Sequence, residues 1–502
     1  MKKVINEMIY LFIIIFFSWI FISSQWLDSN VYYTQNRWIT YLSMFLFIFI
    51  FYIIYYLINK IKNITDKQYY IFAVIYMIVV IIIQIFVDCN LGVELGWDSG
   101  VIYNNAVQFV YNGTRAGAVY TEYFELFPSN ILLLVIEIIT IKIGTIFGIN
   151  NIDSCYVINT ASISFGLLIL SLYSKKKYGN KTGLFTMIVS FFFLPIFLYT
   201  PIIYSDTLTF FVPILILFLF DYIEFDKFNI KNIIIFILLG ILMFYGKEIK
   251  ITSLIIFISL AFCSLFKIKK IKSLLYYIIP VITFILLSII FNTLIVNKKS
   301  LNLFETGMGK YPYSHWIMMG VEDIDKDNSG RNSYGGYNVT DYDLTYNHMK
   351  TGDAVSFNMH EYVNRVRKMK LTGYISYLNK KAVNTWTDGY YYVDVKLGIQ
   401  QPHKDEPIYQ FIFLKNKKFF MYFVQGIQFV FIICLIIDSI INFKNNSEID
   451  YLKLTIIGLA IFFLLWENRS RYLYNYIPLF ILQITILYDS KFKKMKGSKK
   501  NA

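Results

Sequence analysis

The sequence has few of the residues from which many soluble enzymes build their sites. It contains four cysteines, none of them in a CxxC pair, and four histidines without the spacing of a zinc site. It also lacks a glycine-rich phosphate loop ending in Lys-Ser/Thr, a nucleophile elbow and an H-E-x-x-H helix. These absences argue against a disulfide framework, an ATP-driven pump, and a serine or zinc hydrolase.

Charged residues are also scarce, at 16% of the chain, while 57% of the residues are hydrophobic and the mean hydropathy is +0.52. A soluble globule of 502 residues has too little interior to hide this much apolar surface. The sequence therefore predicts an all-α polytopic membrane protein that sits in a lipid bilayer. The net charge of +14 comes from lysine clusters at the ends of apolar segments, so we expect no nucleic-acid partner.

About a dozen apolar runs are long enough to cross a bilayer as helices. Lysine-rich connections place both chain termini in the cytoplasm, and the first run is expected to be retained because no small-x-small cleavage signal follows it. The lysines after the fifth run predict that runs four and five together cross the membrane only once. The runs are 6–24, 39–58, 70–87, 129–149, 154–173, 183–203, 207–222, 233–246, 251–266, 273–295, 418–440, 452–466 and 475–490.

These runs divide the chain into three parts. Residues 1–296 form an N-terminal transmembrane module, in which the first large outer loop, 88–130, interrupts the apolar pattern. Residues 297–417 form an extracytoplasmic loop domain of mixed structure, too long for an ordinary connection and therefore a candidate for function. Within it, 354–382 is expected to be helical. Residues 418–502 hold the last transmembrane helices and a basic cytoplasmic tail.

Two outward-facing carboxylates stand where helices are expected to begin. Asp98 in WDSG follows the third apolar run, and Asp206 in YSDT follows Pro201. An acidic residue at this position often caps backbone amides, which is the alternative for each of them. Acid/base chemistry on a membrane-bound substrate is the other explanation, because a general base must meet its hydroxyl at the lipid boundary.

Arginine is rare in this chain, which makes each one informative. On the predicted topology all of them lie outside, against the usual cytoplasmic bias, and Lys247 and Lys250 lie at or near the same face. The string ENRSRYLYNYIP places Arg469 and Arg471 at the outer end of a span, where guanidinium groups suit a phosphate. A solvated turn with an ion pair is the alternative. The arginines are Arg37, Arg115, Arg331, Arg365, Arg367, Arg469 and Arg471.

Taken in order, several short strings resemble the GT-C superfamily of integral membrane glycosyltransferases. The likeness is closest to its Gram-positive, protein-mannosyltransferase-like branch, which depends on polyprenyl-phosphate sugars. The resemblance implies a GT-C-like bundle with a large first outer loop, a late soluble outer loop and an extracytoplasmic active site at the cell membrane. The strings are WDSGVIYNNA, EYFELFPSN, PIIYSDT, GKEIKIT, HWIMMG, GGYN, TWTDG and ENRSRYLYNYIP.

The reaction implied by this resemblance is sugar transfer, with inversion, from a polyprenyl-phosphate-linked donor to an acceptor hydroxyl of the cell envelope. The acceptor would be a glycan, a teichoic acid or a lipid. No cofactor is assigned, and participation of a divalent cation is left open. Two features depart from the family: two extra spans precede the first outer loop, and GKEIKIT has isoleucine where relatives often have proline.

The resemblance also assigns roles to individual residues. Asp98 and Asp206 match acidic catalytic positions, with Asp98 as the base. Basic positions near the donor phosphate are matched by Lys247, Arg469 and Arg471. Apart from the resemblance, we expect acceptor and sugar binding at Tyr123, Glu125, His315 and Trp316, the last two because aromatic and apolar neighbours at HWIMM favour a membrane-surface segment.

Two other functions stay open at this point. A flippase or transporter for polyprenyl-linked saccharides would show inverted repeats and charges deep within spans. The sequence shows no convincing repeat, and its intramembrane charges, Glu137 and Asp438, are few. A polysaccharide polymerase or ligase would share the donor class and the outer loop, and the sequence separates it poorly from a glycosyltransferase.

Overall fold

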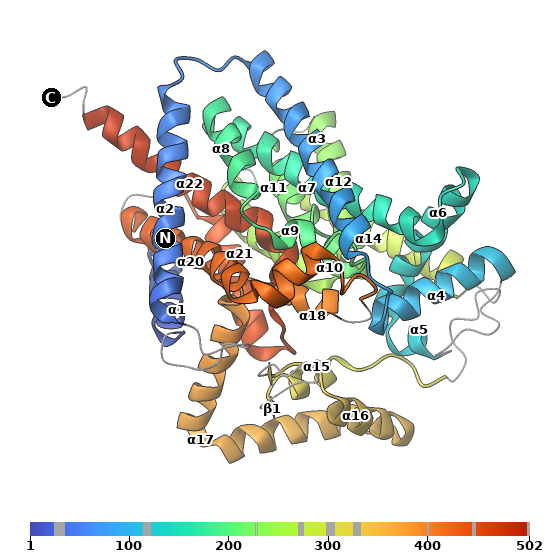
Figure 1. Cartoon of the computed structure of the whole chain (residues 1–502). Helices are drawn as coiled ribbons and strands as arrows, with labels where there is room; N and C mark the ends of the chain where they lie inside the picture. The colour runs from blue at the N-terminus through green and yellow to red at the C-terminus, as the bar shows by residue number, and fades with distance from the viewer. Residues whose placement is uncertain are drawn as a thin grey trace.

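The structure is a computed structural model that describes residues 1–24, 36–113, 122–225, 227, 229–269, 276–297, 307–324, 333–398, 401–443 and 448–498. Helices dominate these ranges. The strands there are β1 (Asp323–Ile324) and β2 (Ser333–Tyr334), which pair antiparallel over two residues each. Figure 1 shows a bundle of long helices above a smaller layer formed by α15 (Tyr313–Met319), α16 (Val339–Thr351) and part of α17 (Ala354–Trp386).

Eight helices in the described part of the chain are long and apolar enough to cross a membrane, and three shorter apolar helices accompany them. The prediction of an all-α polytopic membrane protein is confirmed, whereas the number of about a dozen spans stays a prediction. The eight spans contain α1 (Lys2–Ser23), α2 (Arg37–Lys60), α3 (Asp66–Leu91), α6 (Ile131–Ile146), α7 (Asn151–Tyr178), α12 (Ile230–Ile249), α14 (Ile278–Phe291) and α20 (Lys417–Asn442).

Two runs expected as single spans are broken helices. The run 183–203 contains α8 (Asn180–Ser190) and α9 (Pro195–Leu198), and the run 207–222 contains α10 (Ser205–Leu208) and α11 (Val212–Phe220). Pro195 and Pro213 stand in the first turn of α9 and α11, where a residue without an amide hydrogen fits but from which the preceding helix cannot continue. These breaks bring the short helix α10, with Asp206, to the end of the bundle nearest the outer layer.

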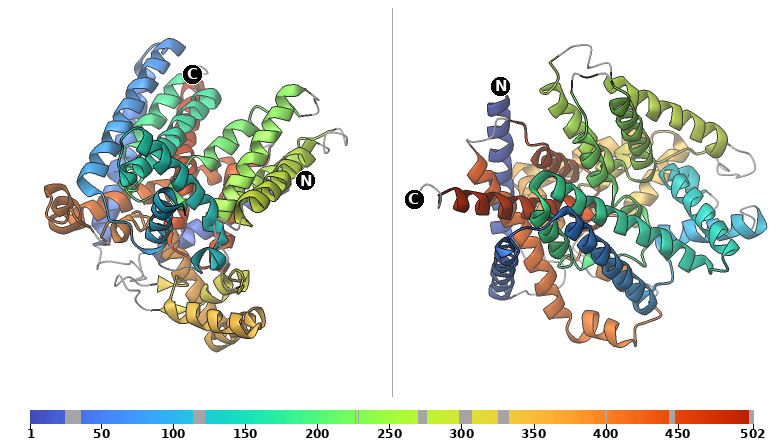
Figure 2. Two further views of the ribbon diagram at one scale, coloured as in Figure 1. Left: turned by 90° about the vertical axis from the view of Figure 1, so that its right-hand side faces the viewer. Right: turned by 90° about the horizontal axis from the view of Figure 1, so that it is seen from above.

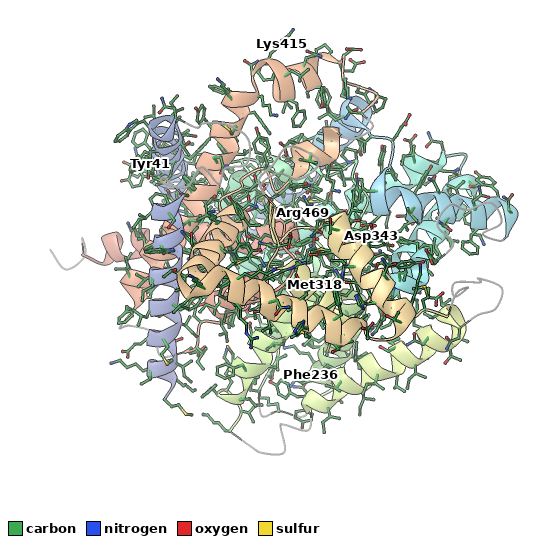
Figure 3. All side chains as sticks on the ribbon, turned by 90° about the horizontal axis from the view of Figure 1, so that it is seen from below. Tyr41, Phe236, Met318, Asp343, Lys415 and Arg469 are labelled. Carbon is green, nitrogen blue, oxygen red and sulfur yellow. The ribbon has the colours of Figure 1, made fainter. Side chains whose placement is uncertain are left out.

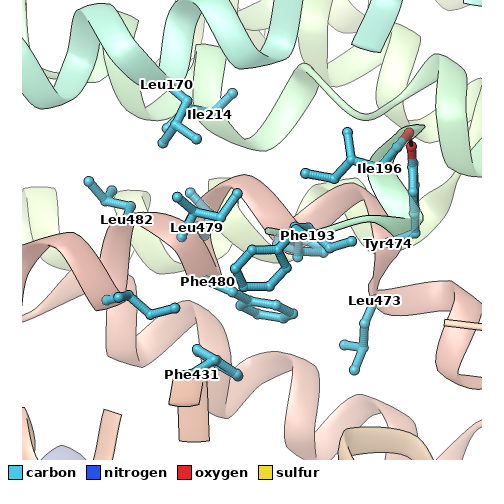
Figure 4. Close-up of a cluster of buried hydrophobic side chains, with 14 of the residues drawn as sticks. Leu170, Phe193, Ile196, Ile214, Phe431, Leu473, Tyr474, Leu479, Phe480 and Leu482 are labelled. Carbon is cyan, nitrogen blue, oxygen red and sulfur yellow. Dashed lines mark hydrogen bonds between the residues drawn. The ribbon is translucent and has the colours of Figure 1, made fainter. Parts of the chain in front are cut away.

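The apolar core lies around α20 and α22 (Ile477–Ser498). Figure 4 shows Phe431 of α20 stacked on Phe480 of α22, with ring centroids 4.2 Å apart, and Leu170 of α7 and Ile214 of α11 in the same cluster, beyond Leu479 and Leu482. Helix α20 also packs against α1 and α2. At Gly426 a Cβ would overlap the Ser43 hydroxyl of α2, so this close helix contact depends on a small residue.

The predicted helix at 354–382 is confirmed as α17, with an elbow at Lys370, where φ is 55°. One arm runs along the outer layer and the other rises into the bundle, as Figures 1 and 2 show. In that second arm Trp386 is 1% exposed and meets Phe17 of α1 edge to face at 5.0 Å. Much of 381–397, expected as part of a soluble loop, is therefore buried among the helices of the bundle.

Shorter elements connect the long helices, and several of them carry residues that line the candidate site. They are α4 (Trp97–Asn112), α5 (Tyr123–Leu126), η1 (Pro128–Asn130), η2 (Ile251–Ser253), α13 (Leu254–Leu265), η4 (Asn292–Val296), α18 (Val393–Gly398), α19 (Pro407–Tyr409), η6 (Gln410–Lys415), α21 (Tyr451–Leu465) and η7 (Ser470–Tyr476).

Candidate functional site

A cavity of about 1920 Å³ lies where the bundle meets the outer layer. It exceeds the roughly 300–1,000 Å³ of a pocket for one drug-sized ligand, so it has room for parts of two substrates. Of the nine residues that the sequence assigned to a site, eight line it and Asp206 does not. The eight are Asp98, Tyr123, Glu125, Lys247, His315, Trp316, Arg469 and Arg471.

Asp98 stands in the first turn of α4 and faces the cavity. The N-cap of this helix is Gly96, and within the described chain Asp98 caps no backbone amide, so the capping alternative has no support here. The Tyr204 hydroxyl donates a hydrogen bond to Asp98 Oδ2 at 3.1 Å. Burial, and then the charge of Asp98, raise the pKa of Tyr204, which keeps the phenol protonated as a donor.

The backbone around this cavity is strained at two aromatic residues. Trp97 and Tyr392 both line it, with φ of 48° and 66°, in the left-handed region that non-glycine residues rarely adopt. Such a conformation costs about 1–3 kcal/mol and persists where surrounding contacts impose it, often at functional sites. Trp97 meets the Tyr204 ring edge to face at 4.8 Å, which places Asp98 beside Tyr204.

Asp206 lies behind the cavity wall and is 2% exposed. Its Oδ1 forms an ion pair with the Lys250 ammonium, and its Oδ2 accepts from Arg471 Nη1 at 3.3 Å. Both carboxylate oxygens are therefore engaged with cations. The two carboxylates that look alike in sequence thus differ in structure: Asp98 faces the cavity, whereas Asp206 holds two cations in place.

Arg471 is buried, yet its guanidinium reaches the cavity. Its Nε is buried and has no hydrogen-bond partner among the described residues. The guanidinium carbon lies 5.0 Å from the ring centroid of Tyr472 and 5.3 Å from that of Tyr204. A buried donor without a partner is costly, and a guanidinium at a cavity wall can donate to an anionic oxygen.

Arg469 also lines the cavity, and Figure 3 shows it near the centre of the molecule when viewed from the outer layer. Its Nη1 donates to the Tyr392 hydroxyl, and its Nη2 donates to the Tyr337 carbonyl at 3.3 Å. Of the other arginines, Arg365 pairs with Asp341 in the outer layer at 2.7 Å. Arg115 and Arg331 lie outside the described residues.

Lys396 of α18 is a cavity residue that the sequence reasoning missed. Its ammonium lies 3.3 Å from the centre of the Trp97 ring, and among the described residues no carboxylate is within ion-pair distance. Burial, and then the charges of Arg471 and Arg469, hold the pKa of Lys396 well below its usual range. An anion at this point would relieve the repulsion among these cations. Lysine is common in this sequence, so no local signal marked this one.

Lys247 of α12 lines the cavity as well, but its ammonium pairs with Glu248 at 2.6 Å. This neighbour offsets its charge. Lys247 therefore differs from Lys396, which has no such carboxylate among the described residues.

The residues assigned to the acceptor also line the cavity. Glu125 is 1% exposed and accepts a hydrogen bond from the Gly309 amide at 2.9 Å, and the Tyr123 hydroxyl accepts from Asn130 Nδ2 at 2.7 Å. Trp316 stacks on Trp466 with ring centroids 5.7 Å apart. These contacts build a wall of aromatic faces and amide-held carboxylates, the surfaces that suit a carbohydrate.

His315 has a structural contact in addition to its place in the cavity wall. Its Nδ1 lies 2.8 Å from the Thr345 hydroxyl, which itself donates to Asn358 Oδ1 at 3.1 Å. The imidazole is therefore the donor to Thr345, and α15, α16 and α17 are joined through this chain. Burial lowers the pKa of His315 to about 4, so the ring is neutral at pH 7.

A buried lysine fixes the segment that carries the arginines. Lys381 of α17 is 0% exposed, and its ammonium donates to the Gly320 carbonyl at 2.6 Å and the Trp466 carbonyl at 2.7 Å. The Glu467 amide donates to the Trp316 carbonyl at 2.8 Å. The outer layer and the turn before η7 are thereby held together, which sets where Arg469 and Arg471 point.

The comparisons with known proteins agree with the membrane fold. In the described part of the chain, no three His, Cys, Asp or Glu side chains are grouped to hold a metal ion. No curated protein and no solved structure matches the chain. A family model described as conserved hypothetical integral membrane protein matches residues 1–492, and the chain therefore belongs to that family.

Proposed function

We propose that this integral membrane protein is a glycosyltransferase that moves a sugar from a polyprenyl-phosphate-linked donor to an acceptor hydroxyl. The observation that carries the proposal is the content of one cavity at the edge of the bundle. Asp98, which has no cation within ion-pair distance among the described residues, shares this cavity with Lys396 and Arg471, whose positive groups lack full partners within the described chain. A base beside an anion site is what displacement of a lipid phosphate needs.

In the proposed reaction Asp98 accepts the proton of the acceptor hydroxyl while that oxygen attacks the anomeric carbon. The bond between this carbon and the phosphate oxygen breaks, and polyprenyl phosphate leaves with the bonding electron pair. Arg471, Arg469 and Lys396 stabilise the negative charge that grows on the phosphate. Attack from the side opposite the leaving group inverts the anomeric centre. No group needs to protonate the phosphate, because it leaves as a stabilised anion.

Asp206 has a supporting role in this proposal. It orients Arg471 and Lys250 through its two oxygens, which keeps the guanidinium aimed at the cavity. Lys247, already paired with Glu248, is the weaker of the proposed phosphate ligands. Tyr123, Glu125, His315 and Trp316 would border the sugar and the acceptor, a cell-envelope glycan, teichoic acid or lipid at the extracytoplasmic face of the cell membrane.

The test is sugar transfer in proteoliposomes supplied with a panel of polyprenyl-phosphate hexoses, comparing the natural protein with Asp98→Asn. The substitution keeps the shape and removes the base, so we expect kcat to fall by about 10²- to 10⁴-fold. Asp153→Asn is the matched control, because Asp153 is an exposed carboxylate in the first turn of α7 and does not line the cavity. Equal turnover of Asp98→Asn and the natural protein would refute the role of Asp98. Movement of the lipid-linked saccharide between leaflets without transfer would identify a flippase instead.

A further inference from the structure

Residues that line the cavity are also exposed on the outside of the bundle at two places, at Asn292 and at Leu414. The first place, the α14 mouth, includes Phe291, Asn292 and Val296, and the second, the η6 mouth, includes Tyr409, Phe413 and Leu414. Both contain a π-helical segment, η4 and η6, a geometry that is rare and recurs at functional sites. Figure 3 shows Lys415, at the end of η6, on the opposite side of Arg469 from Phe236 of α12, the helix that packs against α14.

Each mouth adjoins an apolar surface that would face the bilayer. Helix α14 has 6% of its span buried, against 28–78% in the other seven candidate spans, so it stands at the edge of the bundle. Leu294 at its outer end is 60% exposed. At the η6 mouth Phe411 is 60% and Leu414 55% exposed. A lipid chain can lie against either surface without entering water.

The two mouths adjoin different helices of the site. Phe291 of the α14 mouth belongs to the same apolar cluster as Ile102 and Ala106 of α4, the helix with Asp98 in its first turn. The η6 mouth adjoins α18, where the Tyr409 hydroxyl lies 3.8 Å from the position of a Cβ at Gly398, two residues after Lys396. The α14 mouth thus shares a cluster with the helix that carries the proposed base, and the η6 mouth lies next to the helix that carries Lys396.

We propose that the acceptor is itself lipid-anchored and approaches through the α14 mouth, while the polyprenyl-phosphate donor approaches through the η6 mouth. This inference rests on the proposed glycosyltransferase function. Drawing a lipid chain out of the bilayer costs about 0.8 kcal/mol for each CH₂ group, so a substrate with such an anchor needs a lateral opening. A water-soluble acceptor would need only the face toward the outer layer. If both substrates carry lipid chains, each needs its own opening, which explains why the cavity has the α14 mouth as well as the η6 mouth.

The experiment follows a radiolabelled sugar from polyprenyl-phosphate hexoses in proteoliposomes doped with a lipid extract of the source cells, with their water-soluble envelope glycans supplied outside. Solvent partition then separates lipid from soluble product, and chromatography of the lipid fraction separates any new labelled lipid from the labelled donor. We expect label in a lipid other than the donor. Val296→Trp should raise KM for the lipid acceptor about tenfold and leave KM for the donor within about twofold, and Leu414→Trp should do the reverse. Ile282→Trp, on the lipid-exposed middle of α14, is the matched control.

The outcomes separate the two proposals. Label found in the soluble fraction, with release of polyprenyl phosphate, would overturn the lipid-anchored acceptor and leave the glycosyltransferase function standing. Label in a new lipid with no difference between Val296→Trp and Ile282→Trp would overturn the α14 route. No release of polyprenyl phosphate from any donor by the natural protein would overturn the proposed function, and the inference with it.

Discussion

Two groups of buried charges in this protein are built differently. In the group inside the bundle, the Lys453 ammonium lies 2.6 Å from Asp438 and 2.8 Å from Asp450, and Gln483 donates to Asp438 at 3.2 Å. None of these residues lines the cavity. In the cavity group, Lys396 and the Nε of Arg471 lack such partners within the described chain.

The difference separates charges that hold helices together from charges that can bind a ligand. A buried ion pair is tolerated only when each partner is satisfied, because removing a charge from water costs several kcal/mol. The Lys453 group meets that condition by itself and joins α20, α21 and α22. The cavity group would meet it fully with an anion bound, as the proposed function requires. Three variants can break or sharpen this contrast.

The largest effect is expected inside the bundle. Lys453→Met leaves Asp438 and Asp450 without their cation, so it should lower the free energy of unfolding by about 3–5 kcal/mol. Denaturant unfolding in detergent micelles measures the loss. The double variant Lys453→Met/Asp438→Leu should recover part of it, and sugar transfer per folded molecule should stay unchanged. A large loss of transfer with unaltered stability would contradict the separation of the two groups.

Arg471→Lys should act in the opposite way, on transfer more than on stability. Lysine keeps the charge and the pair with Asp206 but removes the planar fork and its Nε, so kcat should fall by about 10²-fold. The matched control is Arg367→Lys on the exposed side of α17. Changes of equal size in KM and kcat in both variants would show that Arg471 has no specific role in transfer. Comparing kcat with KM tells whether the contact forms mainly in the transition state.

The sequence predicted part of this contrast and missed part of it. Arg469 and Arg471 stood out because arginine is scarce, and the structure places both in the cavity. The sequence did not single out Lys396, because lysine is abundant and the place of Lys396 in the site depends on its contact with Trp97, about 300 residues earlier in the chain. Asp206 and Asp98 looked equivalent, since each begins a helix. What separates them, the pairing of Asp206 with Lys250 and Arg471, comes from distant elements that no local pattern reveals.

The fold shows the same division between local and distant information. The positions of the long apolar helices and of α17 could be predicted because hydropathy and helical pattern are local properties. Hydropathy alone did not predict the breaks between α8 and α9 and between α10 and α11, although Pro195 and Pro213 mark them. The burial of 381–397 could not be foreseen from a polar, tyrosine-rich string. Its tyrosines are satisfied by partners such as Gln428, which accepts from the Tyr391 hydroxyl at 2.6 Å.

The smallest effect is expected at His315, which lies in the cavity wall but is bonded like a structural residue. Its pKa is about 4 in the folded protein and about 6.5 ordinarily, so between these values the unfolded chain binds the proton more readily. The free energy of unfolding should therefore fall as the pH is lowered from 6.5 toward 4, by at most about 1.4 kcal/mol per pH unit from this group. His315→Gln should remove that part of the slope when unfolding is measured across this range. Above pH 6.5 the ring is neutral in both states, so transfer should show no pH dependence from His315. A pH profile of kcat near neutrality that His315→Gln abolishes would instead place this imidazole among the reacting groups.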